Sequence, residues 1–178
     1  MTQDHEIMLS VKNGDVHKLG QLFDKYAGGL YNYFKFQIRD SANSEDLVQN
    51  VFYSILKYRH TFKNGADFKT WMYTIARNEK NNFLRKKKFS SDIDPEFPEE
   101  DGKTPEEDLV NRVDIDQLRM ALEGISPDNR ELIILNRFTG LPYSQIAEIL
   151  GCEIGALKVR MYRAIKELKD KFHKISGD

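Results

Sequence analysis

The chain has few of the features that indicate a secreted, membrane-spanning or metal-binding protein. Cys152 is the only cysteine, so an intrachain disulfide is impossible. The four histidines are too scattered to suggest a metal cage, and we expect no metal and no other cofactor. No run approaches the roughly 20 apolar residues of a membrane span, and the polar start lacks the apolar core of a signal peptide. We therefore expect a cytoplasmic globular protein with no membrane insertion.

Net charge is also low, at −1, but it is unevenly distributed along the 178 residues. Residues 57–88 contain ten basic side chains and two acidic ones, a net charge of +8, with aromatic residues interleaved. Residues 90–111 contain nine acidic side chains and one lysine, a net charge of −8. A basic stripe with aromatics is typical of a nucleic-acid surface, and the acidic segment hides it in the overall composition.

No alternating apolar pattern typical of a strand rises above chance, so the predicted fold class is all-α. In the N-terminal half, Gly28 and Gly29 predict a bend or break in a long helix. Ser44 is expected to cap the helix that follows. The four helices predicted in this half cover residues 6–11, 16–38, 44–58 and 67–87.

Two of these helices carry polar faces. In the third, the periodicity leaves four side chains outside the apolar stripe, and it favours a solvated surface for them: Asp46, Gln49, Asn50 and Tyr53. In the fourth, Trp71 falls on the apolar side and is expected in the core. The opposite side carries polar groups able to reach phosphates and base edges, namely Lys69, Tyr73, Arg77, Lys80 and Asn81.

Residues 90–111 contain three of the five prolines and no helical periodicity, which predicts a flexible acidic linker. Thr104 and Pro105 suit the start of a helix within it. The linker divides the chain into two small helical domains, residues 1–89 and 112–178.

The C-terminal half shows four short helical patterns. Ser126 and Pro127 are expected to open the second, and its apolar positions predict an inward-facing Phe138. A short helix at 142–150, a glycine turn and a helix at 154–172 with several basic residues follow the helix-turn-helix arrangement. Any small helical bundle explains the same pattern.

These motifs resemble the bacterial sigma-70 family. Its region 2.2 pattern is similar to SEDLVQNVFYSIL, and its region 2.3 to 2.4 pattern to FKTWMYTIARN. Its region 4 helix-turn-helix is similar to RELIILNRFTGLPYSQIAEILGCEIGALKVRMYRAIKEL. The resemblance covers most of residues 16–172 and is closest to the compact extracytoplasmic-function (ECF, group IV) sigma factors. It implies a protein without enzymatic activity that binds RNA polymerase core and directs promoter-specific transcription initiation.

The resemblance also implies roles for individual residues. Asp46, Gln49, Asn50 and Tyr53 would meet the polymerase clamp, although the family usually carries an acid at the position of Asn50. The loop around Phe62, Asn64 and Asp67 matches the loop that captures a flipped base of the minus-10 element. The single strand would then follow Lys69, Tyr73, Arg77, Lys80, Asn81 and Arg85.

In region 4, the helix from Ile154 would enter the major groove of the minus-35 element. Here the sequence departs from the family, because Glu153 replaces a small capping residue and Pro142 replaces a serine. Two hydroxyl side chains are also missing, which predicts an atypical minus-35 preference. The expected DNA contacts are Ala156, Lys158, Val159, Arg160 and Arg163.

Three other functions are compatible with parts of this pattern. A stand-alone helix-turn-helix regulator would bind DNA without polymerase. A sigma-like adaptor would bind polymerase or an anti-sigma protein without directing transcription. A nucleic-acid-modifying enzyme is disfavoured, because the dense carboxylates lie in the linker and there is no glycine-rich phosphate loop. Only a sigma factor yields promoter-dependent RNA when added to core enzyme.

The resemblance further implies partners: the polymerase clamp and flap, promoter DNA, and an anti-sigma factor. For the acidic linker it suggests passage through the polymerase channel, where the −8 charge would imitate nucleic acid. A simple spacer is an equally good interpretation. Replacing the acids with Ser and Asn should change the level of abortive initiation on a promoter template if the linker acts in the channel, whereas a spacer predicts no change.

Overall fold

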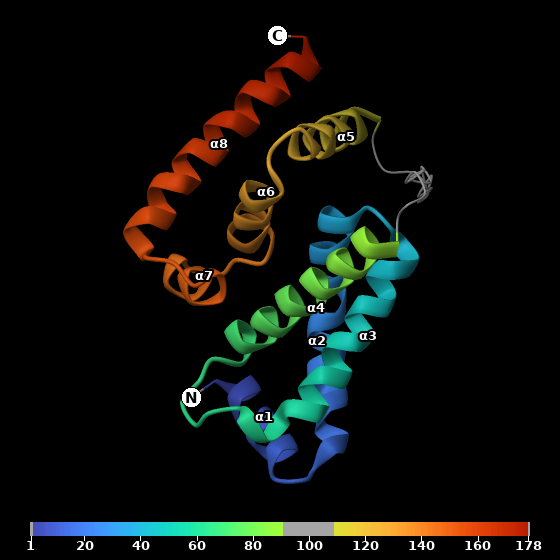
Figure 1. Cartoon of the computed structure of the whole chain (residues 1–178), viewed down its shortest axis with the longest axis vertical. Coiled ribbons are helices and arrows are strands. Elements are labelled where there is room, and N and C mark those ends of the chain that lie inside the picture. Colours follow the sequence, from blue (N-terminus) through green and yellow to red (C-terminus); the bar gives the residue numbers. More distant parts are fainter. Residues whose placement is uncertain (1, 91–108, 178) are drawn as a thin grey trace. The chain divides into compact units, whose positions relative to one another are not determined.

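The computed structural model describes residues 2–90 and 109–177, and every element in those ranges is helical (Figure 1). The segment 91–108, including the predicted helix start at Thr104, lies outside the described residues. Helices extend into both ends of the predicted linker, to Ser90 and from Leu109. The chain forms two compact units, an N-terminal domain with α1 to α4 and a C-terminal domain with α5, α6, most of α7, and α8.

In the N-terminal domain, α3 packs against both α2 and α4, and α1 contacts the start of the connection between α3 and α4. Figure 1 shows α1 beside this connection. Buried apolar residues from α2, α3 and α4 form the core. The elements are α1 (Gln3–Lys12), the 3-10 turn η1 (Val16–Lys18), α2 (Leu19–Ile38), α3 (Ser41–Tyr58), the 3-10 turn η2 (Arg59–Thr61) and α4 (Phe68–Ser90).

The predicted break in the second helix is wrong, because α2 runs without interruption through Gly28 and Gly29. A β-carbon built on Gly29 would lie 3.5 Å from the hydroxyl oxygen of Tyr73 in α4. That is an ordinary van der Waals distance, so Tyr73 packs against this part of α2 without requiring a glycine there. Packing against a neighbouring helix outweighs the roughly 1 kcal/mol by which glycine weakens a helix.

The predicted cap of α3 is also wrong. The helix begins at Ser41, and the side chain of Asp40 accepts a hydrogen bond from the Asn43 amide at 3.0 Å. Ser44 is instead buried in the helix, where its hydroxyl donates to the Asp40 carbonyl. Burial raises the pKa of Asp40, but the two Asn43 donors together with the charges of Lys87 and Lys35 outweigh burial, and the net pKa lies below its usual value.

The C-terminal domain is organised around the long α8, which packs against α5 and α6. Arg130, itself buried, donates hydrogen bonds to the carbonyls of Leu122, Glu123 and Ile125, and so fixes the connection between α5 and α6. The elements are α5 (Leu109–Glu123), α6 (Pro127–Ile133), the π-helical turn η3 (Ile134–Phe138), α7 (Tyr143–Leu150) and α8 (Ile154–Ser176).

The prediction that Ser126 caps α6 is confirmed, since its hydroxyl accepts from the Asn129 amide at 3.3 Å. The prediction that Phe138 faces inward is wrong, because this side chain is 48% exposed. The π turn explains the difference: the Thr139 amide donates to the Ile134 carbonyl, five residues back. The extra residue in this turn shifts the register of the helix, so the 3.6-residue pattern no longer applies at Phe138.

A buried carboxylate joins α1 to α2. Both oxygens of Asp4 lie 2.7 Å from the Lys25 ammonium, and the Tyr26 hydroxyl donates to one of them at 2.5 Å. Burial raises the pKa of Asp4, but the Lys25 and Tyr26 donors and the Lys25 charge outweigh burial and hold the net pKa below its usual value. This contact stabilises the fold when Asp4 is ionised.

Asp4→Asn should lower the free energy of unfolding by about 1–2 kcal/mol at pH 7, because it removes the charge from these hydrogen bonds. The folded-state pKa of Asp4 is depressed, so its contribution is present above the unfolded pKa and is lost as pH falls through the folded value. Urea unfolding at pH 7 and pH 3.5 should therefore show a difference between wild type and variant that shrinks in acid.

Asp15→Asn is the matched control, because Asp15 is exposed and lies 3.6 Å from Lys18 in a surface ion pair. It should change stability by less than about 0.5 kcal/mol at either pH. An Asp4→Asn effect of the same size at both pH values would contradict the assignment.

Candidate nucleic-acid and polymerase interfaces

The outer face of α3 presents four polar or aromatic side chains to solvent. The buried stripe of this helix, which includes Val51 and Ile55, faces the core. All four residues predicted on the opposite side are exposed, Tyr53 by 67%. The residues of this face are Asp46, Gln49, Asn50 and Tyr53.

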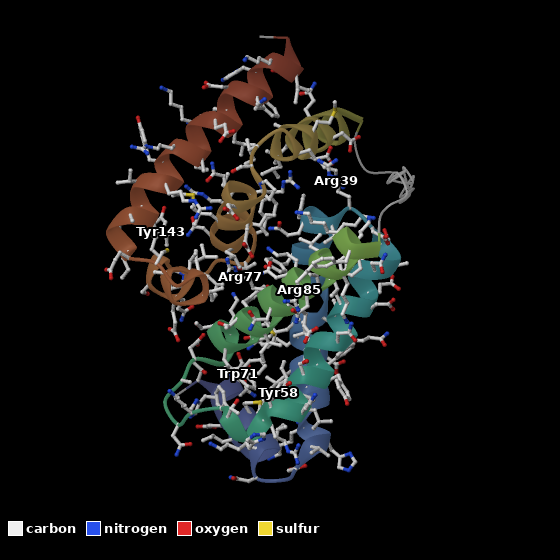
Figure 2. All side chains as sticks on the ribbon, in the orientation of Figure 1. Arg39, Tyr58, Trp71, Arg77, Arg85 and Tyr143 are labelled. Atoms are coloured by element: carbon white, nitrogen blue, oxygen red, sulfur yellow. The ribbon has the colours of Figure 1, made fainter. Side chains whose placement is uncertain are left out.

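On α4, the predicted basic face is only partly at the surface. Asn81 and Arg85 are exposed, and Lys69 and Arg77 are half-buried. Figure 2 shows Arg77 and Arg85 on this helix, with Trp71 nearer its start. Trp71 is half-buried, so its predicted place in the core is confirmed only in part.

Tyr73 was expected on the basic face, and that placement is wrong. The side chain is 2% exposed, and its ring packs edge-on against Tyr33 of α2 with centroids 5.6 Å apart. Burial raises the pKa of its hydroxyl, which stays protonated at neutral pH. Tyr73 is therefore a packing residue between α2 and α4.

Lys80 was also expected to face outward but is 5% exposed. Its ammonium lies 5.9 Å from the centroid of the Tyr33 ring, within the range of a cation–π contact. Lys80 thus turns towards α2, and Tyr33 contacts both misplaced side chains. The periodicity failed here because a long side chain can bury its methylenes while its charge rests on an aromatic face.

Lys69 lies near the start of α4 among other charges. Burial lowers the pKa of its ammonium, the Asp67 carboxylate opposes this effect, and the charge of Lys25 adds to it. The side chain remains half-exposed. It is thus a partly accessible cation beside the connection before α4.

That connection, residues 62–67, is anchored in the core at one end and exposed at its tip. Phe62 is fully buried, with its ring centroid 5.1 Å from that of Trp71 and 5.4 Å from that of His5. Its ring is therefore not presented to a base, contrary to expectation. Asn64 is exposed, as expected. We call this segment the 62–67 loop.

Asp67, expected to contact a base, closes the loop by capping α4. One of its carboxylate oxygens accepts hydrogen bonds from both the amide and the hydroxyl of Thr70, each at 2.8 Å. An Asp before a helix that satisfies a first-turn amide is a common cap, and the sequence DFKT carries this signal. Part of its hydrogen-bonding capacity is thus used within the fold.

In the C-terminal domain, α7 and α8 are joined by a short turn (Figure 1). Gly151 has φ +66° there, a left-handed conformation that favours glycine. Glu153 precedes α8 and its side chain makes no capping hydrogen bond, in agreement with the predicted loss of a small capping residue. The turn and the two helices form the helix-turn-helix arrangement.

The start of α8 has clearly separated faces. Leu157, Met161 and Ala164 are buried at three- and four-residue steps. A shallow groove of about 570 Å³ runs along the helix between Asn129 and Arg163. Four of the five predicted DNA contacts are exposed in this region: Ala156, Lys158, Val159 and Arg163.

Arg160 is the exception, because it is half-buried and engaged with α6. Its Nε donates to the Asn129 side-chain oxygen at 3.1 Å, and its guanidinium lies 4.0 Å from the Asp128 carboxylate. The Asn129 amide in turn donates to Glu167 at 3.1 Å. Arg160 thus joins α8 to α6, a role that the sequence pattern did not indicate.

Two exposed apolar residues of α8 were not anticipated. Tyr162 is 74% exposed, and Ile154 is also exposed. Tyr162 follows Val159 by three residues, which places the two side chains on neighbouring positions of the helix surface. That spacing is visible in the sequence and could have identified Tyr162 as a member of the same face.

In the described ranges, no group of three or more His, Cys, Asp or Glu side chains could hold a metal ion. Of the helices described, none is both long and apolar enough to cross a membrane.

Comparison with known proteins identifies both domains. A model of Sigma-70 region 2 matches residues 22–90, and a model of Sigma-70, region 4 matches residues 115–168. The ECF RNA polymerase sigma factor BldN of Streptomyces coelicolor is 27% identical over 167 residues, which cover 92% of this chain but only 63% of BldN. The RNA polymerase sigma factor CarQ of Myxococcus xanthus is 27% identical over 162 residues, which cover 89% of this chain and 91% of CarQ.

A solved structure is similar as well. The sigma factor RpoE of Bartonella quintana, in complex with the anti-sigma factor NepR, aligns with a TM-score of 0.71 and 29% identity over 85% of this chain and 94% of RpoE. The all-helical fold, the order of the two matched regions and the relatives that match most of this chain agree with one another. The chain therefore belongs to the sigma-70 family as an ECF sigma factor, a non-catalytic subunit that directs RNA polymerase in transcription initiation.

Proposed function

We propose that this sigma factor reads its promoter in two forms of DNA, the minus-35 element as duplex through α8 and the minus-10 element as melted single strand through α4 and the 62–67 loop. The observation that carries the proposal is the exposed surface of α8. Ala156, Val159 and Arg163 line a shallow groove there, and Lys158 is exposed outside the groove. A helix of this kind, placed after a short helix and a turn, fits the major groove.

For the minus-10 element, the burial of individual side chains narrows the proposed contacts. Arg77, Asn81 and Arg85 follow one another along α4 and reach solvent at least in part. We assign them to the single strand, together with Lys69 and the exposed tip at Asn64. Phe62, Tyr73 and Lys80 support this surface from beneath.

The free energy needed to melt promoter DNA is larger than the sigma factor alone can supply, so the polymerase is required. Opening about ten base pairs costs on the order of 14 kcal/mol of stacking. One or two captured bases return only about 1–3 kcal/mol each. The sigma factor alone therefore does not melt DNA, and its loop acts on a strand that the polymerase helps to separate.

We assign core binding to the exposed face of α3 that contains Asp46, Gln49, Asn50 and Tyr53, with the polymerase clamp as its partner. The C-terminal domain would meet the flap. An anti-sigma factor is a further proposed partner, because RpoE of Bartonella quintana was solved with one bound. Action on the polymerase implies a cytoplasmic location.

Arg77→Ala should weaken open-complex formation by about five-fold or more, because it removes a cation from the proposed single-strand path, whereas binding to core should be unchanged. Promoter-dependent transcription with core enzyme and permanganate footprinting of the melted strand measure the first quantity. Fluorescence titration of labelled sigma factor with core measures the second.

Changing Asp46 and Gln49 together to Ala is the converse control, since these residues lie on the proposed polymerase face. That double variant should lose core affinity. If Arg77→Ala instead reduces core binding, or leaves the extent of melting unaltered, the assignment of α4 to the single strand is incorrect.

Ala156→Thr and Val159→Ser should change the preferred minus-35 sequence, because each adds a hydroxyl to an exposed position of α8, and Val159→Ser also removes apolar surface able to meet a thymine methyl. Selection from a promoter library randomised at minus-35, followed by footprinting of the holoenzyme, measures the preference. Each altered contact should be worth about 1–3 kcal/mol of discrimination.

Glu148→Gln is a suitable control for this experiment, because Glu148 is exposed on α7 and not on the face of α8. It should select the wild-type sequence. An unchanged library optimum in both α8 variants would show that these two positions do not read bases.

A further inference from the structure

Two side chains of α1 hold the 62–67 loop, one at each end. The Nδ1 atom of His5 lies 2.8 Å from the Ala66 carbonyl oxygen. A carbonyl oxygen only accepts hydrogen bonds, so Nδ1 carries the proton and donates it. The Lys12 ammonium donates to the Phe62 carbonyl oxygen at 2.5 Å.

The hydrogen bond from His5 to Ala66 is costly to lose because His5 is buried. The side chain is 3% exposed, and its ring lies 5.4 Å from the Phe62 ring. Its other nitrogen, Nε2, is buried and has no hydrogen-bond partner within the described residues. The bond to Ala66 is therefore the one that compensates the burial of this polar ring, and its loss would be costly.

The helix that provides these contacts is itself fixed to the domain. Asp4, next to His5 in the chain, is held by Lys25 and Tyr26 of α2. Thr2 accepts from the His5 amide and caps α1. Because α1 is fixed to α2 in this way, its side chains hold the 62–67 loop in a defined position.

Between the two held ends, the loop tip is exposed. Lys63, Asn64 and Gly65 reach solvent, and the Ala66 amide donates to the Lys63 carbonyl at 3.1 Å, which closes a turn. A tip whose backbone is already closed loses less conformational entropy when it meets a base than a mobile loop does, so it is better prepared to discriminate between bases.

We propose that α1, which precedes the part of the chain matched to region 2, sets base selectivity at the minus-10 element by holding the 62–67 loop, with His5 and Lys12 as positioning residues. Neither residue contacts DNA in this scheme. The inference rests on the proposed role of the loop in reading a flipped base.

The test uses the full chain and its holoenzyme with four variants. His5→Ala and Lys12→Met each remove one contact to the loop. His5→Asn keeps an amide N–H that can replace Nδ1, and it is the conservative rescue. His17→Ala is the matched control, because His17 is exposed in η1.

Two quantities are measured. Hydrogen exchange of the Ala66 amide reports closure of the loop. Transcription from promoters that differ by one base at the captured position reports selectivity, where the captured position is the minus-10 base whose preference Asn64→Ala abolishes. Core affinity and thermal unfolding are recorded alongside.

His5→Ala and Lys12→Met should each speed exchange of the Ala66 amide about five-fold and reduce base selectivity by a similar factor, with core affinity unchanged. His5→Asn and His17→Ala should match wild type in both measurements. If His5→Ala fails to fold, Lys12→Met, on a half-buried side chain, carries the test.

Wild-type selectivity in both His5→Ala and Lys12→Met would overturn the inference while leaving the base-reading function intact. Failure of His5→Asn to restore exchange and selectivity would also count against a positioning role. A wild-type holoenzyme with no minus-10 base preference sensitive to Asn64→Ala would instead refute the base-reading function itself, and this inference with it.

Discussion

The contact between α2 and α4 at Tyr33 decides what the N-terminal domain can present to nucleic acid. Tyr33 is buried, its ring packs edge-on against Tyr73, and the Lys80 ammonium lies over it. The Tyr73 hydroxyl lies beside Gly29, one turn earlier on α2, at van der Waals distance from where a β-carbon would be. These contacts set the rotation of α4 about its own axis, because turning the helix would expose an aromatic ring and move a cation away from its ring partner.

With that rotation set, the polar residues predicted on the basic face of α4 separate into two groups. Lys80 contributes to packing, and Arg77, Asn81 and Arg85 remain along the surface. The same packing holds the ring of Phe62 near Trp71 and Phe68, which anchors the loop before α4. The aromatic core and the proposed DNA surface are thus two sides of one helix, and a change to the first displaces the second.

In the C-terminal domain, polar contacts fix the positions of the helices. Arg130 fixes the connection between α5 and α6 through three backbone carbonyls, and Arg160 fixes α8 to α6 through Asn129. The π turn at Ile134–Phe138 shifts the helix register before α7 begins. Of these contacts, that of Arg160 acts on α8 directly and holds its first turns beside Asn129, at the groove that Ala156, Val159 and Arg163 also line.

The sequence by itself determined the all-helical class, the two domains, the exposed face of α3 and the helix-turn-helix, because local periodicity, caps and glycine turns act within a few residues of one another. It also indicated four exposed residues of α8, Ala156, Lys158, Val159 and Arg163, but not the exposure of Tyr162. Only the tertiary structure decided that Tyr73, Lys80 and Phe62 are buried, that α2 continues through its glycines, and that α1 holds the 62–67 loop. These depend on partners far along the chain, such as Ala66, which is 61 positions after His5, and no local pattern records which distant side chain a residue will meet.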